Sequence, residues 1–574
     1  MVQVKKEKQR QHGASKKQAE KSIPGKQKHI VPLFVIVLVS FIAFLPVLHN
    51  GFVNLDDDKY IQNNPMLSSL NLKEIFSRFF DGNYHPFTML VYAIEFHLWG
   101  LNATGYHTIN LLLHLLNVML VFYVVFRISD QKEIAFLASL LFGIHPMHVE
   151  SVAWASELKD LLYAFFFLAS YAFYLRFLIE QKTKFYYYCL LLFLFSLFSK
   201  AMAVSLPVVL LLTDYFKGRK MNAKIFIEKI PFFVMSLFFG VLAIVAQKST
   251  GAIQHLDFFS FPQRIVFACY GFIMYLLKLF IPLQLSAYYP YPVKSGAGIP
   301  GGYYVFPVLL LGLMAFVFYS LRSSKKIFFS VGFFTVTVFI VLQLLPVGNV
   351  IMADRYCYIP SIGIFYLAGE GFYRLWTKKT SAFNPKLAVR VLVGILGIFF
   401  LISTYTRSKV WENSLSLWND VIGNYQTIPI AYNNRGMALE AGNKMDEALA
   451  DYTKTIELQP DFALPYNNRG NILMNRQKNE LALLDYNKAI ELDPGLSQPY
   501  NGRGVLLMRE KKFDLAVTDY RKAIQLKPNY PEVYYNLALC EFNSGKKEDA
   551  CRDMQKAASL GIQQANEMLN QYCR

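Results

Sequence analysis

The chain has 574 residues, of which 54% are hydrophobic and only 17% are charged. Soluble globular domains usually carry about a quarter charged residues, so this composition excludes an ordinary soluble enzyme and favours an integral membrane protein. The net charge of +18 does not indicate nucleic-acid binding, because the basic residues collect in the N-terminal tail and in short loops between apolar runs. That distribution is typical of topology signals on the cytoplasmic side of a membrane.

The chain begins with a basic tail. Residues 1–29 are rich in lysine and contain only Glu7 and Glu20 as acids, so we expect this tail to be disordered and cytoplasmic. The apolar run near 31–49 is too long for a signal-peptide core and lacks a small-residue cleavage site. We therefore interpret this run as a retained first span.

Further apolar runs predict a polytopic helical membrane domain over residues 30–408. A span needs about 20 mainly apolar residues. The runs lie near 31–49, 105–126, 134–147, 160–178, 185–199, 202–216, 226–247, 264–285, 304–321, 327–346, 358–376 and 388–406.

The loop cations orient these runs. With the tail inside, residues 50–104 form an outer loop. A full crossing by 264–285 would place Arg322, Lys325 and Lys326 outside, against the positive-inside rule. We therefore expect 264–285 to lie in the outer interface or to re-enter without crossing. This gives about eleven crossings and places the C-terminal domain on the non-cytoplasmic side.

A 34-residue period marks residues 429–574, and it is the length of a tetratricopeptide (TPR) repeat. The small residues of this period let two helices approach, the tyrosines fill the space between them and the prolines end the second helix. The period predicts four TPR repeats in an α-solenoid, so the whole chain is expected to be all-α. Residues 409–428 are predicted to form a half-repeat connector. The period is carried by Gly436, Gly470, Gly504 and Ala538, by Tyr452, Tyr486 and Tyr520, and by Pro460, Pro494 and Pro528.

Three carboxylates, Asp56, Asp57 and Asp58, follow the first span. Crowded like charges raise one another's pKa, so one of these groups could act as a base while another binds a cation or orients a substrate. A solvated acidic turn at the membrane surface is the alternative interpretation.

Other polar groups lie at the outer ends of later spans. His145 and His148 share a helical face if the helix continues past Pro146, so they could ligate a metal or simply form hydrogen bonds. Arg355 could hold a phosphate or pair with Asp354. Ionisable residues near membrane depth are costly and are candidates for function. The groups are His145, His148, Glu150, Lys159 and Asp160, then Lys200, then Asp354 and Arg355.

The topology derived from loop cations places all these groups and the aspartates on one side of the membrane. Acids on one loop and cations on others indicate a site for a lipid phosphate and a hydroxyl acceptor.

These residues, taken in order, match a known pattern. The chain resembles the transmembrane-and-TPR protein family, whose eukaryotic members look like protein O-mannosyltransferases of the GT-C fold. The resemblance covers nearly everything after residue 45. It rests on Phe52 and Val53 with Asp56, Asp57 and Ile61; Tyr84, His85 and Pro86; Tyr106 and His107 with Asn110 and His114; His145, Pro146, His148 and Glu150; Ser199 and Lys200; Ala353 to Tyr356 with Pro360, Ser361 and Gly363; and the repeats.

The resemblance implies a polyprenyl-phosphate sugar donor, with mannose as the sugar, and a Ser or Thr acceptor. Asp56 or Asp57 would be the base that takes the acceptor proton. Lys200 and Arg355 would be candidates for the donor phosphate, while His145, His148 and Glu150 would shape the pocket. The family generally needs no metal, so we expect neither a metal nor another cofactor.

The chain departs from the eukaryotic pattern at two places. Eukaryotic members typically have Arg where this chain has His85, and a Gly-Arg-Ala-Asp-like run where this chain has Glu157 to Asp160. We keep His85, Lys159 and Asp160 as pocket candidates. The departures and the short array resemble bacterial relatives, so we expect a multi-pass protein of a bacterial inner membrane, or of the ER with a lumenal array if the source is eukaryotic.

Asparagines recur on the first helix of each repeat and could bind an extended acceptor peptide through its backbone. Solvent-facing amides of a common repeat consensus are the alternative. The residues are Asn433 and Asn434, Asn467 and Asn468, and Asn501.

The leading hypothesis is therefore a GT-C glycosyltransferase whose external repeats recruit a protein acceptor. One rival is a non-catalytic, membrane-anchored TPR scaffold for envelope proteins. A second rival is a flippase or transporter, which would need polar residues at mid-membrane depth.

Six cysteines are too few for a disulfide scaffold. Cys540 and Cys551 fall on adjacent helices and could bridge in an oxidising compartment. Two buried thiols are the alternative.

Overall fold

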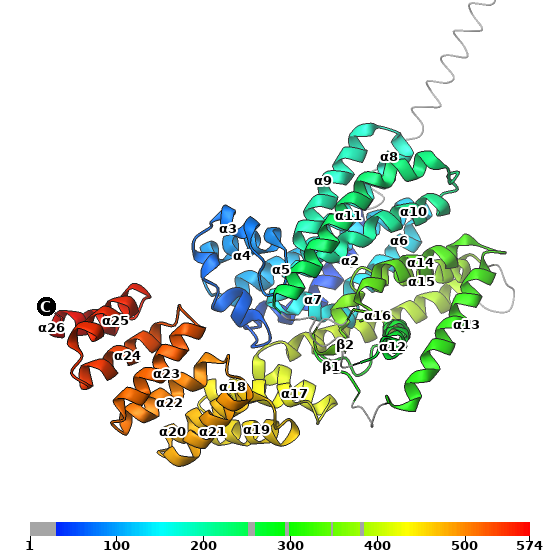
Figure 1. Ribbon diagram of the computed structural model, residues 1–574. Coiled ribbons are helices and arrows are strands. Elements are labelled where there is room, and N and C mark those ends of the chain that lie inside the picture. Colours follow the sequence, from blue (N-terminus) through cyan, green and yellow to red (C-terminus); the bar gives the residue numbers. More distant parts are fainter. Residues whose placement is uncertain (1–29, 251–258, 293–297, 346–347, 379–383, 574) are drawn as a thin grey trace, which may run out of the picture. The chain divides into compact units, whose positions relative to one another are not determined.

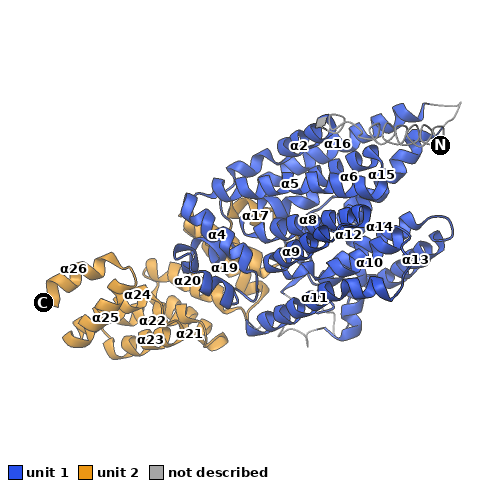
Figure 2. Ribbon diagram, turned by 90° about the horizontal axis from the view of Figure 1, so that it is seen from above, with its two compact units in different colours: residues 1–52, 56–412 blue, residues 53–55, 413–574 orange. Residues whose placement is uncertain are grey.

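The computed structural model describes residues 30–250, 259–292, 298–345, 348–378 and 384–573. The predicted disordered tail, residues 1–29, lies outside this range. The chain forms two compact units (Figures 1 and 2), and each is described by itself. Unit 1 comprises residues 1–52 and 56–412, and unit 2 comprises residues 53–55 and 413–574.

Unit 1 is a polytopic helical membrane domain, as predicted. Among the described residues, 7 helices are long and apolar enough to cross a bilayer, or 8 if a bent pair counts as one span. The total of about eleven crossings stays a prediction, since it also counts shorter apolar helices. The long helices are Val31–His49, Ala103–Ser129, Ala155–Glu180, Ala223–Ser249, Phe261–Phe280, Gly301–Ser320 and Pro385–Val410, and the bent pair is Lys132–Ile144 with Pro146–Ala153.

Two details of these spans bear on the predicted topology. The bent pair turns by 54° at His145, because Pro146 cannot continue the hydrogen-bond ladder of the preceding helix. The segment expected to lie in the interface or to re-enter is one continuous helix, α12 (Phe261–Phe280). Its length permits a full crossing, so length alone does not decide between crossing and re-entry.

The helices of unit 1 are labelled in chain order (Figure 1). Its α-helices are α2 (Ile30–Phe44), α3 (Leu72–Ser77), α4 (Pro86–Trp99), α5 (Ala103–Ser129), α6 (Lys132–Ile144), α7 (Val149–Ala153), α8 (Leu158–Glu180), α9 (Thr183–Ser199), α10 (Leu206–Phe216), α11 (Ala223–Ser249), α12 (Phe261–Phe280), α13 (Val305–Ser320), α14 (Lys325–Val338), α15 (Ser361–Thr377) and α16 (Pro385–Val410). Its short 3-10 helices, together with one π-helical turn, η3, are η2 (Leu45–His49), η3 (Asp58–Gln62), η4 (Pro65–Ser68), η5 (Pro146–His148), η6 (Ala155–Glu157), η7 (Ala201–Ser205), η9 (Gly301–Tyr304), η10 (Phe339–Val341) and η11 (Asp354–Cys357).

The segment between α2 and α5, predicted as an outer loop, is a folded layer. Tyr60, Ile61 and Met89 of this segment share one buried apolar core with Leu158 and Leu162 of α8. Burial of a large apolar side chain contributes about 1.5–3 kcal/mol, so this core holds the aspartate turn close to the start of α8.

A short antiparallel pair of strands, β1 (Tyr289–Pro290) and β2 (Val350–Met352), interrupts the helices of unit 1. The sequence pattern did not predict it. Tyr289 Oη donates a hydrogen bond of 2.8 Å to Asp354 Oδ1, and the backbone N–H of Ala353 donates one of 3.0 Å to Tyr275 Oη. These bonds fix the chain where η11 begins, one residue before Arg355.

Unit 2 is a TPR array of helix pairs, as the 34-residue period predicted. A Cβ added at Gly436 would stand 2.7 Å from Tyr452 Cε1, so only glycine lets the two helices of the first pair approach. The helices are α17 (Ser414–Asn424), α18 (Pro429–Ala441), α19 (Met445–Leu458), α20 (Ala463–Asn475), α21 (Asn479–Leu492), α22 (Ser497–Arg509), α23 (Phe513–Leu526), α24 (Pro531–Asn543), α25 (Lys547–Ser559) and α26 (Gln563–Tyr572).

A repeated ion pair clamps the two helices of each of the first three pairs. Each pair joins an arginine of the first helix to an aspartate of the second, 16 residues later, through two N–H···O bonds of 2.7–2.8 Å. Two-pronged contacts of this kind are stronger and more directional than single ones. The pairs are Arg435–Asp451, Arg469–Asp485 and Arg503–Asp519.

A three-residue segment from the predicted outer loop, Val53–Leu55, belongs to unit 2 (Figure 2). Asn54 holds it there: its Oδ1 accepts from Trp418 Nε1 at 2.7 Å, and its Nδ2 donates to the Asn434 carbonyl at 2.8 Å. Its backbone N–H donates to Ser414 Oγ at 2.9 Å. Hydrogen bonds of Asn54 thus hold residues 53–55 within unit 2.

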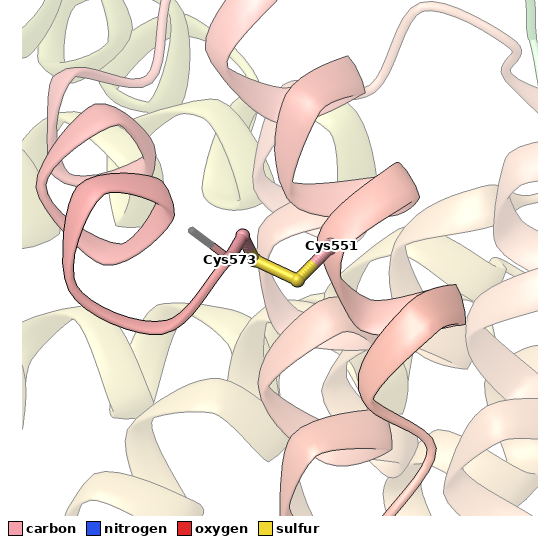
Figure 3. The surroundings of a disulfide bond; sticks show 2 residues. All are labelled: Cys551 and Cys573. Atoms are coloured by element: carbon pink, nitrogen blue, oxygen red, sulfur yellow. A yellow bond between two sulfur atoms is a disulfide. The ribbon is translucent and has the colours of Figure 1, made fainter.

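The possible bridge between Cys540 and Cys551 does not form. Cys551 on α25 pairs with Cys573, which follows α26, with a Cα–Cα distance of 5.7 Å (Figure 3). Cys540 is instead a free thiol, fully buried in the apolar core that α23 and α24 share. Neighbouring helices do not imply facing cysteines, since the two side chains leave their helices in different directions.

Candidate active site

The structure places the adjacent aspartates in different environments. Asp57 is fully buried, and its Oδ1 accepts a hydrogen bond of 2.9 Å from the backbone N–H of Ser156. Asp56 is half-buried, and burial raises the pKa of its carboxyl while the Lys159 ammonium opposes that rise. Asp57 therefore joins the outer layer to the loop before α8, whereas Asp56 presents a carboxylate with a raised proton affinity.

Lys159, in the first turn of α8, is the cation that lowers the pKa of Asp56 most strongly. Its Nζ lies 3.2 Å from Glu157 Oε1 and 4.6 Å from the centre of the Tyr60 ring. The Trp154 ring centre is 5.7 Å away. An ammonium between aromatic faces is held by cation–π attraction as well as by its ion pair.

Glu157 joins three cations. Besides Lys159, its carboxylate lies 3.5 Å from Lys200 Nζ and 3.4 Å from Arg355 Nε. Its side chain is only 2% exposed. A buried carboxylate is stable in ionised form only when cations and hydrogen bonds surround it, and three cations meet that requirement here.

Lys200 lies in extended backbone between α9 and η7. It forms an ion pair with Asp160 in addition to its contact with Glu157, and its Nζ lies 6.0 Å from the Tyr356 ring centre. An ammonium has three N–H donors, and Asp160 accepts a hydrogen bond from one of them, while Glu157 contributes its charge.

Arg355 in η11 pairs with Glu150 rather than with Asp354, the partner that the sequence offered. Glu150 accepts from the Arg355 guanidinium and, at 2.9 Å, from its backbone N–H. Burial alone would lower the pKa of Arg355, but the surrounding carboxylates, Glu150 first, outweigh burial and raise it. The guanidinium carbon lies 4.9 Å from the Tyr356 ring centre.

Exposure divides this cluster into two layers. The side chains of Glu150, Glu157 and Asp160 are 4%, 2% and 1% exposed, while those of Lys200 and Arg355 are 18% and 15% exposed. The acids thus form the base of the cluster and the cations its accessible side, so an incoming anion meets the cations first.

His85, at the start of α4, lies next to this cluster. Its ring centre is 5.5 Å from that of Tyr60, and it is 4% exposed. Burial lowers the pKa of the imidazole to about 3, and Lys159 and Lys200 act in the same direction. His85 is therefore neutral at physiological pH and can serve as a polar wall but not as a cation.

His145 and His148 are not part of the charged cluster. Both are fully buried, and their ring nitrogens bond to the Leu279 carbonyl at 3.1 Å, to the Phe142 carbonyl at 2.8 Å and to Ser361 Oγ at 3.1 Å. They fasten helix ends within unit 1. Among the described residues, no group of three His, Cys, Asp or Glu side chains could hold a metal ion.

The predicted peptide-binding asparagines pair with one another along the array. Asn468 Nδ2 donates to Asn433 Oδ1 at 3.5 Å, and Asn536 Nδ2 donates to Asn501 Oδ1 at 3.1 Å. The buried Asn433 and Asn467 donate to the next residue's amide, Asn434 and Asn468, at 3.0 and 3.1 Å. Peptide binding by these amides stays a prediction.

Glu157 is not among the residues predicted from the sequence, although it forms more ion pairs in the cluster than any predicted residue does. The available signal was its position two residues before Lys159 in a run of polar residues at a span end. Tyr60 and Tyr356 were also absent from the predicted site. Nothing in their spacing indicates that they line a cluster of cations.

The comparisons with known proteins cover both units. Models of the tetratricopeptide repeat match residues 429–462, 463–496 and 531–560, and a model described as TPR repeat matches residues 506–545. Protein O-mannosyl-transferase F38B6.6 of Caenorhabditis elegans is 27% identical over 76% of this chain and 64% of its own length. Over about three quarters of its length the chain is thus similar to a protein named protein O-mannosyl-transferase, and its C-terminal part matches TPR models.

Two further relatives with the same description are similar to the chain over a comparable stretch. Protein O-mannosyl-transferase Tmtc1 of Drosophila melanogaster is 22% identical over 74% of this chain and 61% of its own length, and TMTC3 of Homo sapiens is 24% identical over 74% and 51%. The chain therefore spans between half and two thirds of the length of these homologues. Among solved structures, the MamA protein of Desulfovibrio magneticus shares 17% identity, with a TM-score of 0.24 over 26% of this chain and 83% of its own.

Proposed function

We propose that the chain is a GT-C-type membrane glycosyltransferase. It would move a sugar, with mannose as the first candidate, from a polyprenyl-phosphate donor to a Ser or Thr hydroxyl of a protein. The observation that carries the proposal is the cluster of buried acids with Lys200 and Arg355 on its accessible side, whose members Lys159 and Glu157 also act electrostatically on Asp56. The homology to protein O-mannosyl-transferases supports the same reaction.

In the proposed reaction Asp56 acts as the general base. Its carboxylate takes the proton of the acceptor hydroxyl as that oxygen forms a bond to the anomeric carbon of the sugar. The bond between the anomeric carbon and the phosphate oxygen breaks, and the polyprenyl phosphate leaves with the electron pair. One such displacement inverts the anomeric centre.

Lys200 and Arg355 would bind the donor phosphate and stabilise the charge that develops on it. Both form ion pairs with Glu157. In addition, Lys200 pairs with Asp160 and Arg355 pairs with Glu150. Cations fixed in advance need little reorganisation as the leaving group gains charge. We assign the reaction no metal and no cofactor, so these side chains would supply the electrostatic stabilisation.

The reaction would take place on the non-cytoplasmic side, in a bacterial inner membrane or in the ER. The Cys551–Cys573 disulfide supports this orientation for the array, because disulfides persist in oxidising compartments and are rare in the cytosol. In intact cells an impermeant thiol reagent should label Cys551 and Cys573 only after reduction by an impermeant reductant. If labelling instead requires lysis of the cells, the array lies on the cytoplasmic side.

The array would recruit the protein acceptor, through the asparagine pairs or another part of the repeats. A scaffold that only anchors the array is the rival function. A scaffold does not require the charged cluster, so a single substitution in the proposed site distinguishes the two functions. Glycopeptide mass spectrometry of envelope proteins should show loss of O-linked hexose in Asp56→Asn cells at normal expression. Unchanged glycopeptides would favour the scaffold.

A further inference from the structure

A cavity of about 460 Å³ lies in unit 1 among α2, α6, α15 and α16, away from the charged cluster. Its walls are mainly apolar and aromatic and include Val35, Phe136, Phe372 and Val393. α6 packs against α2 and α15, and α16 packs against the same two helices. The cavity is therefore built by four helices of the membrane domain and not by a mobile loop.

Cations stand at one end of this cavity. Lys132 is the first residue of α6, and Arg390 lies in the second turn of α16; both line the cavity and both are exposed. The Arg390 guanidinium carbon lies 5.2 Å from the Trp376 ring centre, and Lys386 Nζ lies 5.9 Å from the same ring. The lining also includes one acid, Glu133.

These cations lie where helices of the membrane domain begin or end. α2 starts at Ile30, α6 at Lys132 and α16 at Pro385, while α15 ends at Thr377 just after Trp376. Tryptophan, lysine and arginine are enriched at membrane–water interfaces, where an amphipathic ring and a long cation meet lipid headgroups. The cavity thus runs from headgroup level into the apolar layer.

The chemistry of the walls selects the occupant. A soluble anion would gain little from the apolar walls, and a zwitterionic lipid carries no net charge for the cations to attract. We infer that this cavity binds an anionic glycerophospholipid, with its phosphate near Lys132 and Arg390 and its acyl chains along Val35, Phe136 and Val393. The inference is independent of the proposed transfer reaction.

A second cavity in the same unit provides an internal contrast. It measures about 330 Å³ and is lined only by apolar residues of α6, α12, α15 and α16, among them Leu279 and Phe400. Without a cation it can accept acyl chains but cannot distinguish headgroups by charge. Headgroup selectivity should therefore depend mainly on Lys132 and Arg390, the two cations that line the first cavity.

The test uses the purified full chain in vesicles of phosphatidylcholine with a minor fraction of phosphatidylglycerol. Native mass spectrometry after gentle extraction counts the lipids retained by each variant. We expect phosphatidylglycerol to be retained about tenfold above its mole fraction, since each interfacial cation favours an anionic lipid by about fivefold and Glu133 opposes them. The variant Lys132→Gln/Arg390→Gln should retain both lipids in proportion to their mole fractions.

Two further variants keep the test decisive. Lys220→Gln/Lys224→Gln removes two exposed cations that do not line the cavity, so it should retain the wild-type preference. Val393→Trp fills the cavity and leaves both cations, so it should lose the retained lipid. The inference is overturned if the wild type shows no preference for phosphatidylglycerol. It is also overturned if Lys132→Gln/Arg390→Gln or Val393→Trp folds and still shows the wild-type preference.

Discussion

Asp57 Oδ1 accepts a hydrogen bond of 2.9 Å from the backbone N–H of Ser156, 99 residues later in the chain. This bond ties the acidic turn to the loop that precedes α8. It commits Asp57 to holding the outer layer, whereas Asp56 is the general base of the proposed reaction. Two aspartates that look equivalent in the sequence thus have different environments, and the proposal gives them different tasks.

The first prediction separates these tasks. Asp57→Ala leaves the buried Ser156 N–H without this acceptor, so the free energy of unfolding should fall by about 1–3 kcal/mol. Asp57→Asn retains an acceptor oxygen and should retain most activity. Asp56→Asn should leave thermal stability unchanged while transfer falls by about 100-fold or more. Thermal unfolding and initial rates on the same preparations check all three, and the reverse pattern would make Asp57 the base.

The second prediction concerns pH. The base must be deprotonated, so transfer should fall as pH decreases through the pKa of Asp56, and the raised pKa of that carboxyl places this fall above the ordinary aspartate range. Lys159 lowers this pKa more strongly than Lys59 does. Lys159→Gln should therefore move the acid limb of the rate profile to higher pH, and Lys59→Gln should move it less. An unmoved limb in both variants would remove Asp56 from the role of titrating base.

The third prediction tests the phosphate site. Lys200→Gln alone leaves Asp160 buried without its cation, so we pair it with Asp160→Asn. The double variant should fold, and its KM for the polyprenyl-phosphate donor should rise by about 10- to 100-fold, the loss of one charge-assisted contact. The single variant Asp160→Asn is the control, because it keeps Lys200. A KM that rises equally in the control would assign the effect to structure and not to the phosphate.

The fourth prediction concerns Asn54, whose side chain bonds Trp418 and the Asn434 carbonyl within unit 2. Asn54→Ala leaves the Trp418 indole N–H without this acceptor, so amide hydrogen exchange in α17 and α18 should increase by at least about tenfold. Asn54→Asp keeps the acceptor for Trp418 and loses the donor, so its effect should be intermediate. Exchange that stays at the wild-type level in Asn54→Ala would show that the segment does not depend on this side chain.

Much of the fold follows from periodic signals that a single sequence carries. Glycine and tyrosine at 34-residue spacing implied the close helix pairs, and the contact of Gly436 with Tyr452 is that implication in atomic form. The membrane class followed from long apolar runs, because the bilayer sets the length of a span. Both signals are local in the chain and repeat many times.

The remainder depends on side-chain directions and distant contacts. Glu157 could be seen as one polar residue among several, but its position between Lys200 and Arg355 requires three separate helix ends to converge. The disulfide partner of Cys551 depended on where the final helix folds back, which the 34-residue pattern does not specify. The placement of Val53–Leu55 in the array likewise has no periodic signal.

The most direct test is transfer by the purified full chain in vesicles. The protein is given polyprenyl-phosphate mannose with a radiolabelled sugar and a peptide containing Ser and Thr, and the label in the peptide is counted. Wild-type protein should label the peptide, and Asp56→Asn of equal stability should lose about 100-fold or more of that rate. Equal labelling by the two proteins, or none by the wild type with any polyprenyl-phosphate sugar, would contradict a transferase that uses Asp56 as its base.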